Sequence, residues 1–203
     1  MKTLALLGTT FGFAFAAGLN LYATILVIGV TLRFGWIAMP EPLAGLAVLS
    51  HPVVLGVAAV MYLVEFLADK VPAVDHAWDA VHTVVRPIGA AWIAWRTIGG
   101  AGLPEAVDVA VLLVAGGVAL SAHVGKAGTR LATGSVGGHA LGVGVALSLL
   151  EDLVAFVLAP LALLKPLLVL GLVVVALAVL AMVIPRGFRA LRRWWRPPAG
   201  SRG

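Results

Sequence analysis

The chain has 203 residues, of which 62% are hydrophobic and only 11% are charged, and its mean hydropathy is +1.08. Soluble domains carry about 25% charged residues, so this composition excludes a water-soluble globular domain. The apolar runs are long and continuous, which favours helices that satisfy their own backbone hydrogen bonds in lipid. We therefore predict an all-α, polytopic membrane helix bundle.

The net charge of +5 is concentrated at one end of the chain, and there are no cysteines. The absence of cysteine excludes disulfides and thiol chemistry. We interpret the basic C-terminal segment as a topology signal that contacts anionic lipid head groups rather than nucleic acid. Its arginines are Arg186, Arg189, Arg192, Arg193, Arg196 and Arg202.

The first apolar run covers residues 4–32, and we expect a break in it at Gly18-Leu19-Asn20, because lipid cannot satisfy the asparagine amide. A signal peptide is the alternative, with Lys2 before the apolar residues and a cleavage-like Ala14-Phe15-Ala16. Further apolar runs bring the expected number of transmembrane helices to about six. They cover residues 43–68, 74–98, 106–123, 139–160 and 167–184.

Orientation follows from the distribution of Lys and Arg between the two sides of such a six-helix arrangement. Most of the basic residues, including the tail, fall on the side that also holds the N-terminus. We therefore expect a multi-pass protein of the bacterial inner membrane with both termini in the cytoplasm.

Two short similarities suggest an internal repeat. Ala17-Gly18 precedes Thr31 as Ala115-Gly116 precedes Thr129, and a Glu precedes Pro72 and Pro160 in the two halves. Because each half would hold three spans, the second copy would be inverted, as in many secondary transporters; chance similarity in a biased composition is the alternative. The division would be a first half at 1–100, a second half at 101–185 and a basic tail at 186–203.

Glu151 and Asp152 lie well inside an expected span, where a carboxylate costs about 2.5–3.5 kcal/mol on insertion scales. Neighbouring residues point about 100° apart on a helix, so at least one should face the bundle interior. One interpretation is a proton or cation site. The other is a buried ion pair with Arg86, Lys126 or Arg130.

A second polar group is the helical stripe of Asp75, Asp79, His82 and Arg86, spaced four, three and four residues apart. It fits a cation site, a proton relay through His82, or a solvated helix face whose charges pair along the helix. All three interpretations stay open.

Other polar residues are less informative. Glu65 and Asp69 either join a central site or pair with Lys70 at the interface, and Asn20 either lines a cavity or bonds across helices. HExxH, GxSxG and the Walker glycine loop are absent from the sequence, so we expect neither an enzyme nor a cofactor. The sequence does not decide whether a metal binds.

The stretch EFLADKVPAVDHAWDAVHTVVRPIGA, which starts at Glu65, resembles the core of a family of small bacterial membrane proteins, DUF4126. The Gly18-Leu19-Asn20 segment and the span holding Glu151-Asp152 also fit that family. The resemblance covers most of the chain except the basic tail. It implies a membrane protein and brings no assigned activity.

Our functional hypothesis is a transporter or channel-like protein whose membrane-embedded carboxylates bind a proton or cation, moving a small ion or small molecule. The alternative is a scaffold, lipid-binding or assembly protein whose charges form structural ion pairs. A homodimer through Gly138 and Gly142 is a further option. The candidate binding residues are Asn20, Glu65, Asp69, Asp79, His82, Arg86, Glu151 and Asp152.

Overall fold

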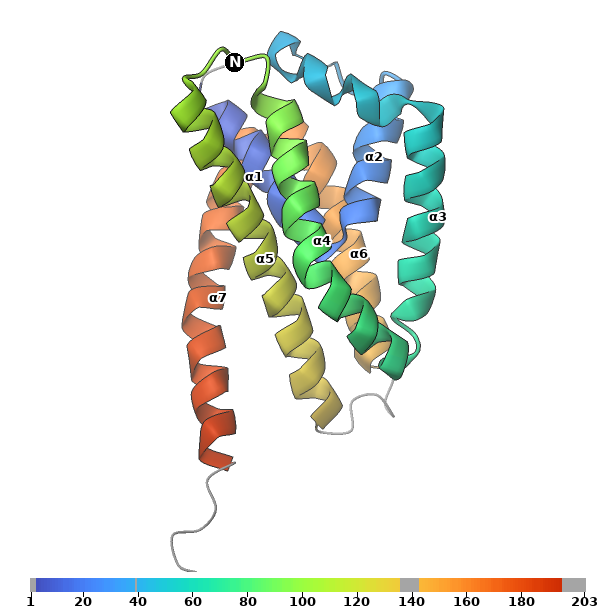
Figure 1. Ribbon diagram of the computed structural model, residues 1–203, viewed down its shortest axis with the longest axis vertical. Coiled ribbons are helices and arrows are strands. Elements are labelled where there is room, and N and C mark those ends of the chain that lie inside the picture. The colour runs from blue at the N-terminus through green and yellow to red at the C-terminus, as the bar shows by residue number, and fades with distance from the viewer. Residues whose placement is uncertain (1–2, 39, 136–142, 195–203) are drawn as a thin grey trace, which may run out of the picture.

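The computed structural model describes residues 3–38, 40–135 and 143–194, and this part of the chain is helical with no strand (Figure 1). The helices pack side by side as a bundle, while the 3-10 helix η1 lies across one end of it. The elements in chain order are α1 (Thr3–Leu19), α2 (Leu21–Arg33), η1 (Glu41–Ser50), α3 (Pro52–Ala68), α4 (Pro72–Ile98), α5 (Glu105–Ser135), α6 (Val143–Leu164) and α7 (Pro166–Trp194).

Within the described residues, three helices are long and apolar enough to cross a membrane, namely α5 through Arg130, α6 and α7. The η1–α3 pair meets the same criteria only if the two helices count as one span, and they are bent by 72° at His51. The helices α1 and α2 are apolar but shorter. Together these features give a helical membrane bundle, as the composition predicts.

The chain reverses direction between α1 and α2. Gly8, near the start of α1, packs so closely on Pro166 that a β-carbon on it would lie 2.2 Å from the Pro166 carbonyl oxygen. Gly29, near the end of α2, packs equally closely on Leu49 of η1. Since η1 and the α6–α7 turn lie at the same end of the bundle (Figure 1), α1 and α2 form a hairpin that enters and leaves there. We call this end the η1 end.

The expected break in the first apolar run is present. The chain turns back at Gly18-Leu19-Asn20, so α1 and α2 form two antiparallel arms of residues 4–32. The remaining helices α3 to α7 alternate between the two ends. As a result, the start of α1 and the end of α7 lie at opposite ends of the bundle (Figure 1).

Two element boundaries also differ from the sequence expectation. The span expected to end at residue 123 instead continues as α5 to Ser135. The helix α6 runs through Pro160 to Leu164, so the turn before α7 lies at Lys165 alone. Helix α5 is therefore long enough to carry His123, Lys126 and Arg130 on successive turns of one face.

The η1 end of the bundle is closed by apolar packing. Three leucines of η1 are buried where η1 packs against α2 and the last turns of α4, and they form part of one continuous core. Gly45 lets η1 approach α4, since a β-carbon there would lie 2.2 Å from the Arg96 carbonyl oxygen. This core includes Leu43, Leu46, Leu49, Ile93, Ala94, Ile98 and Phe13.

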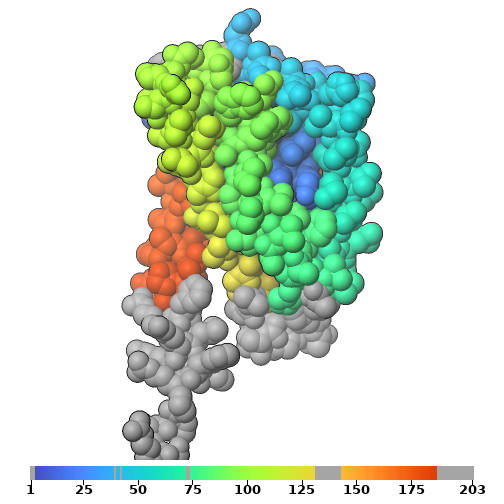
Figure 2. Space-filling model, viewed as in Figure 1, coloured from blue at the N-terminus to red at the C-terminus, as the bar shows by residue number. Residues whose placement is uncertain are grey.

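The outer faces of α3 and α7 are apolar and exposed, as expected for surfaces that contact lipid. On the face drawn in Figure 2, part of the N-terminal hairpin is visible between α3 and α4. The hairpin is therefore not fully enclosed by the other helices on this side.

Candidate functional site

The tip of the α1–α2 hairpin brings polar backbone into the interior of the bundle. Helix α1 has 17 residues, or about 25 Å at 1.5 Å per residue, so its end lies deep inside. Asn20 begins α2 by accepting a hydrogen bond from the Ala23 amide. The last carbonyls of α1 have no partner within their own helix. The Gly18 carbonyl accepts from Arg86 and the Leu19 carbonyl from Lys126, at 3.0 and 3.2 Å.

These contacts have an electrostatic reason. The C-terminus of a helix carries the negative end of its dipole, which favours nearby cations. Arg86 comes from the middle of α4 and Lys126 from α5, and both side chains are fully buried. The hairpin tip is thus held by two positive charges from two other helices.

Arg86 also pairs with Glu65 of α3. Arg86 Nη2 lies 2.5 Å from Glu65 Oε1, and neither side chain has exposed surface. A carboxylate and a guanidinium buried together are tolerated in an apolar interior only as such a hydrogen-bonded pair. One oxygen of Glu65, Oε2, has no hydrogen-bond partner in the described structure.

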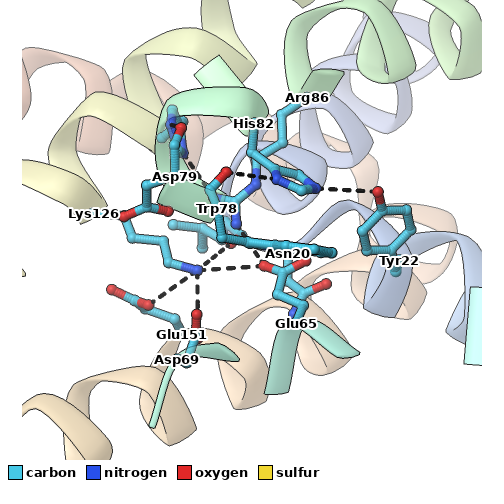
Figure 3. Close-up of polar contacts among 12 residues, drawn as sticks. Asn20, Tyr22, Glu65, Asp69, Trp78, Asp79, His82, Arg86, Lys126 and Glu151 are labelled. Carbon is cyan, nitrogen blue, oxygen red and sulfur yellow. Dashed lines mark hydrogen bonds and ion pairs between the residues drawn. The ribbon is translucent and has the colours of Figure 1, made fainter. Parts of the chain in front are cut away.

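Lys126 lies at the centre of the charged cluster (Figure 3). Its Nζ is 3.5 Å from Glu65, 3.8 Å from Asp69 and 3.4 Å from Glu151. A single ammonium group therefore connects carboxylates from the end of α3 and the middle of α6.

Arg130, one turn further along α5, binds two of the same carboxylates and adds a third, Asp75. It donates to Asp69 at 2.8 and 3.1 Å, to Glu151 at 2.7 Å and to Asp75 in the first turn of α4. Ser148 of α6 adds a 2.7 Å hydrogen bond to Asp69. The helices α3, α4, α5 and α6 are thereby joined through a network of ion pairs.

Asp152 differs from its neighbour Glu151 in having no cation partner. Its side chain accepts from the Asn20 amide at 2.9 Å and from the Tyr62 hydroxyl at 3.4 Å. The residue is only 4% exposed, and no cation lies within ion-pair distance among the residues that the structure describes. A buried carboxylate held by neutral groups alone can gain stability by taking up a proton or a cation.

Two buried histidines lie on the other side of Arg86. His82 contacts the Tyr22 hydroxyl of α2 through Nε2, at 3.1 Å, and the Trp78 carbonyl through Nδ1, at 2.8 Å. His123 contacts Arg86 through Nδ1 at 2.8 Å and the Asp79 carbonyl through Nε2 at 3.0 Å. Both imidazoles therefore have defined partners on two sides.

The structure brings most of the sequence-derived candidates into one network. Glu151 has the ion pairs with Lys126 and Arg130 that one interpretation proposed, whereas Asp152 has none. His82 and Asp79 lie at the edge of the network, not inside it. The candidates that meet in or beside it are Asn20, Glu65, Asp69, Asp79, His82, Arg86, Glu151 and Asp152.

Sequence reasoning gave too little weight to α5 and to two tyrosines. His123, Lys126 and Arg130 are spaced three and four residues apart, a helical spacing that could have placed them on one face; the surrounding glycines suggested a loop instead. Tyr22 and Tyr62 carried no sequence signal. Gly138, Gly142 and the end of the basic tail lie outside the described residues.

The carboxylates and histidines do not form a metal centre: within the described residues, no three His, Cys, Asp or Glu side chains are close enough to hold a metal ion.

A family model for "Domain of unknown function (DUF4126)" matches residues 7–186. The chain belongs to the DUF4126 family. The match covers both arms of the hairpin and every residue of the network described above. No curated protein and no solved structure matches this DUF4126 chain, so the family gives no activity and the site itself must carry the functional argument.

Proposed function

We propose that this DUF4126 protein is a membrane transporter or channel-like protein, and that Asp152 is its proton- or cation-binding group. The observation that carries this proposal is that Asp152 of α6 lies beside the tip of the α1–α2 hairpin, where it accepts a hydrogen bond from Asn20. Broken helices that end deep in a bundle, with polar groups around them, are typical of ion and substrate sites in transporters.

The balance of charge supports the same conclusion. The ion pairs join three cations, Arg86, Lys126 and Arg130, to four carboxylates. Asp152 and Asp79 are additional carboxylates without an ion pair in the described structure. An apolar interior strongly disfavours unbalanced charge, so uptake of protons or cations would neutralise this excess.

The arrangement of the two ends agrees with a one-sided access route. Apolar packing closes the η1 end, whereas the charged side chains extend from the hairpin tip toward the other end, where Asp69 and Asp75 lie. That other end also carries Arg186, in the last turns of α7. By the positive-inside rule, we assign it to the cytoplasm, in a multi-pass protein of the cytoplasmic membrane whose N-terminus lies on the far side.

The neighbouring carboxylates offer a matched test. Asn at 152 can accept from Asn20 through its carbonyl oxygen and donate from its amide to the Tyr62 hydroxyl, but it cannot ionise. Asp152→Asn should therefore keep the fold and lose flux. Glu151→Gln should instead weaken the fold, because Lys126 and Arg130 lose part of their neutralisation.

The measurement is flux into vesicles that contain the purified protein. A pH-sensitive dye reports proton movement under an imposed gradient, and parallel vesicles receive a sodium gradient. We expect flux with the wild type and the rate of empty vesicles with Asp152→Asn, at an unchanged unfolding midpoint. Wild-type flux in the Asp152→Asn variant would refute the site assignment.

The scaffold interpretation keeps one specific observation in its favour, the complete pairing of Glu151 with Lys126 and Arg130. For a scaffold, the wild type should give no flux with either ion. Both variants would then differ from it only in stability or in assembly.

A further inference from the structure

His123 lies where a cavity meets the charged network. A cavity of about 200 Å³ lies between α4 and α5, toward the end of the bundle opposite η1. His76 and Ala80 on its rim are exposed, so the cavity opens to the surface. The rest of its wall includes the buried Asp75, His123 and Arg130, the half-buried Asp79 and the exposed Thr83.

The hydrogen bonds fix the tautomer of His123. Arg86 Nη1 can only donate, so His123 Nδ1, at 2.8 Å, must accept. The proton of the neutral imidazole is then on Nε2, which donates to the Asp79 carbonyl at 3.0 Å and also lies 3.1 Å from the Thr83 hydroxyl. This arrangement requires a neutral His123.

Protonation would change this contact completely. A second proton on Nδ1 would face an Arg86 N–H and turn an attractive contact into a repulsive one. Because the same Arg86 nitrogen donates to the Gly18 carbonyl, a displaced Arg86 would release the hairpin tip. Histidine is the side chain that ordinarily titrates between about pH 5 and pH 8.

We propose that His123 is a proton-binding site, reached through the α4–α5 cavity, that controls how firmly Arg86 holds the tip of the α1–α2 hairpin. The inference rests on the proposed transport function for its purpose, since proton uptake at His123 would change how firmly the hairpin tip is held beside the site. Charged and titratable groups approach His123 from several elements. They are Asp79, His82 and Arg86 on α4, Lys126 and Arg130 on α5, and Glu65 on α3.

The first test reads the tautomers in the intact wild-type protein by NMR of ¹⁵N-labelled histidine. The chain has five histidines, so the signal of His123 is assigned by its loss in His123→Gln. His82 differs in tautomer, because it donates through Nδ1 to the Trp78 carbonyl. We expect the Nε2–H signal of His123 to convert to the doubly protonated form as the pH is lowered from about 8 to about 3. An Nε2–H signal that persists to the lower pH would overturn the proposal.

The second test measures backbone hydrogen exchange of the peptide that covers residues 14–24, corrected for the intrinsic effect of pH. Exchange in the wild type should rise severalfold on acidification. His123→Gln, whose amide oxygen can still accept from Arg86 but cannot be protonated, should abolish the rise. His76→Gln on the rim of the same cavity is the matched control and should keep it.

If His123→Gln shows the same pH response as the wild type, the proposal is refuted. If that variant folds poorly, the NMR result on the wild-type protein still decides. Neither measurement depends on flux. A protein that shows the His123 pH response but no flux would contradict the proposed function and leave this inference standing. A protein that shows flux but no His123 pH response would contradict only this inference.

Discussion

Arg86 and Glu65 form a fully buried ion pair, 2.5 Å between Nη2 and Oε1, that joins the middle of α4 to the last turns of α3. The same arginine donates to the Gly18 carbonyl at the hairpin tip. One guanidinium thus fixes three elements that are far apart in sequence, and its loss should affect all three.

Removing one partner of this pair should therefore be costly. Glu65→Gln leaves the charge of Arg86 buried without its carboxylate, and such a change typically costs about 3–5 kcal/mol. The check is the free energy of unfolding in detergent, with Glu41→Gln on the exposed surface of η1 as the control. The double variant Glu65→Leu with Arg86→Leu should recover part of the loss, because no single charge is left behind; a double variant no better than Glu65→Gln would contradict this.

Asn20 has two functions that a pair of variants can separate. Its side-chain oxygen caps α2, and its amide donates to Asp152. Asn20→Ser keeps a capping oxygen, whereas Asn20→Ala loses it at about 0.5–2 kcal/mol. We expect only the alanine variant to unfold at lower denaturant, while both reduce flux. Equal stability of the two variants would show that the cap is not what Asn20 contributes.

Close packing at the hairpin tip requires glycine at position 18. A β-carbon there would lie 2.3 Å from the Ala119 carbonyl oxygen of α5. Gly18→Ala should therefore shift α1 against α5 and lower the unfolding temperature. Gly117→Ala on α5 is the matched control, because a β-carbon there meets nothing within 4 Å and alanine favours a helix by up to about 1 kcal/mol over glycine. An unchanged unfolding temperature for Gly18→Ala would contradict the packing.

The hairpin makes a definite prediction about topology. Because the chain contains no cysteine, single cysteines can be introduced at Thr3, Glu41 and Arg186 and labelled in intact cells with a reagent that does not cross membranes. Thr3→Cys and Glu41→Cys should label alike, since both lie at the η1 end, and Arg186→Cys should label only after permeabilisation. Six crossings would instead place Thr3 on the side of Arg186.

Much of the fold follows from local sequence. The long apolar runs determine helices because backbone groups in lipid must be satisfied within the segment. Pro52, Pro72 and Pro166 stand at the first positions of α3, α4 and α7, where a missing N–H costs nothing. The break before Asn20 is likewise visible in the sequence, since a glycine and an asparagine interrupt an apolar run.

The sequence by itself therefore determined a membrane helix bundle, the break in its first apolar run and most of the acidic residues of the site. Only the tertiary structure decided that the chain turns back at this break, because direction depends on the packing of Gly8 and Gly29 against distant backbone. It also decided that Glu151 meets Lys126 and Arg130 while Asp152 meets only neutral groups. Neighbouring residues on a helix point about 100° apart, and which helix faces each of them is a property of the assembled bundle.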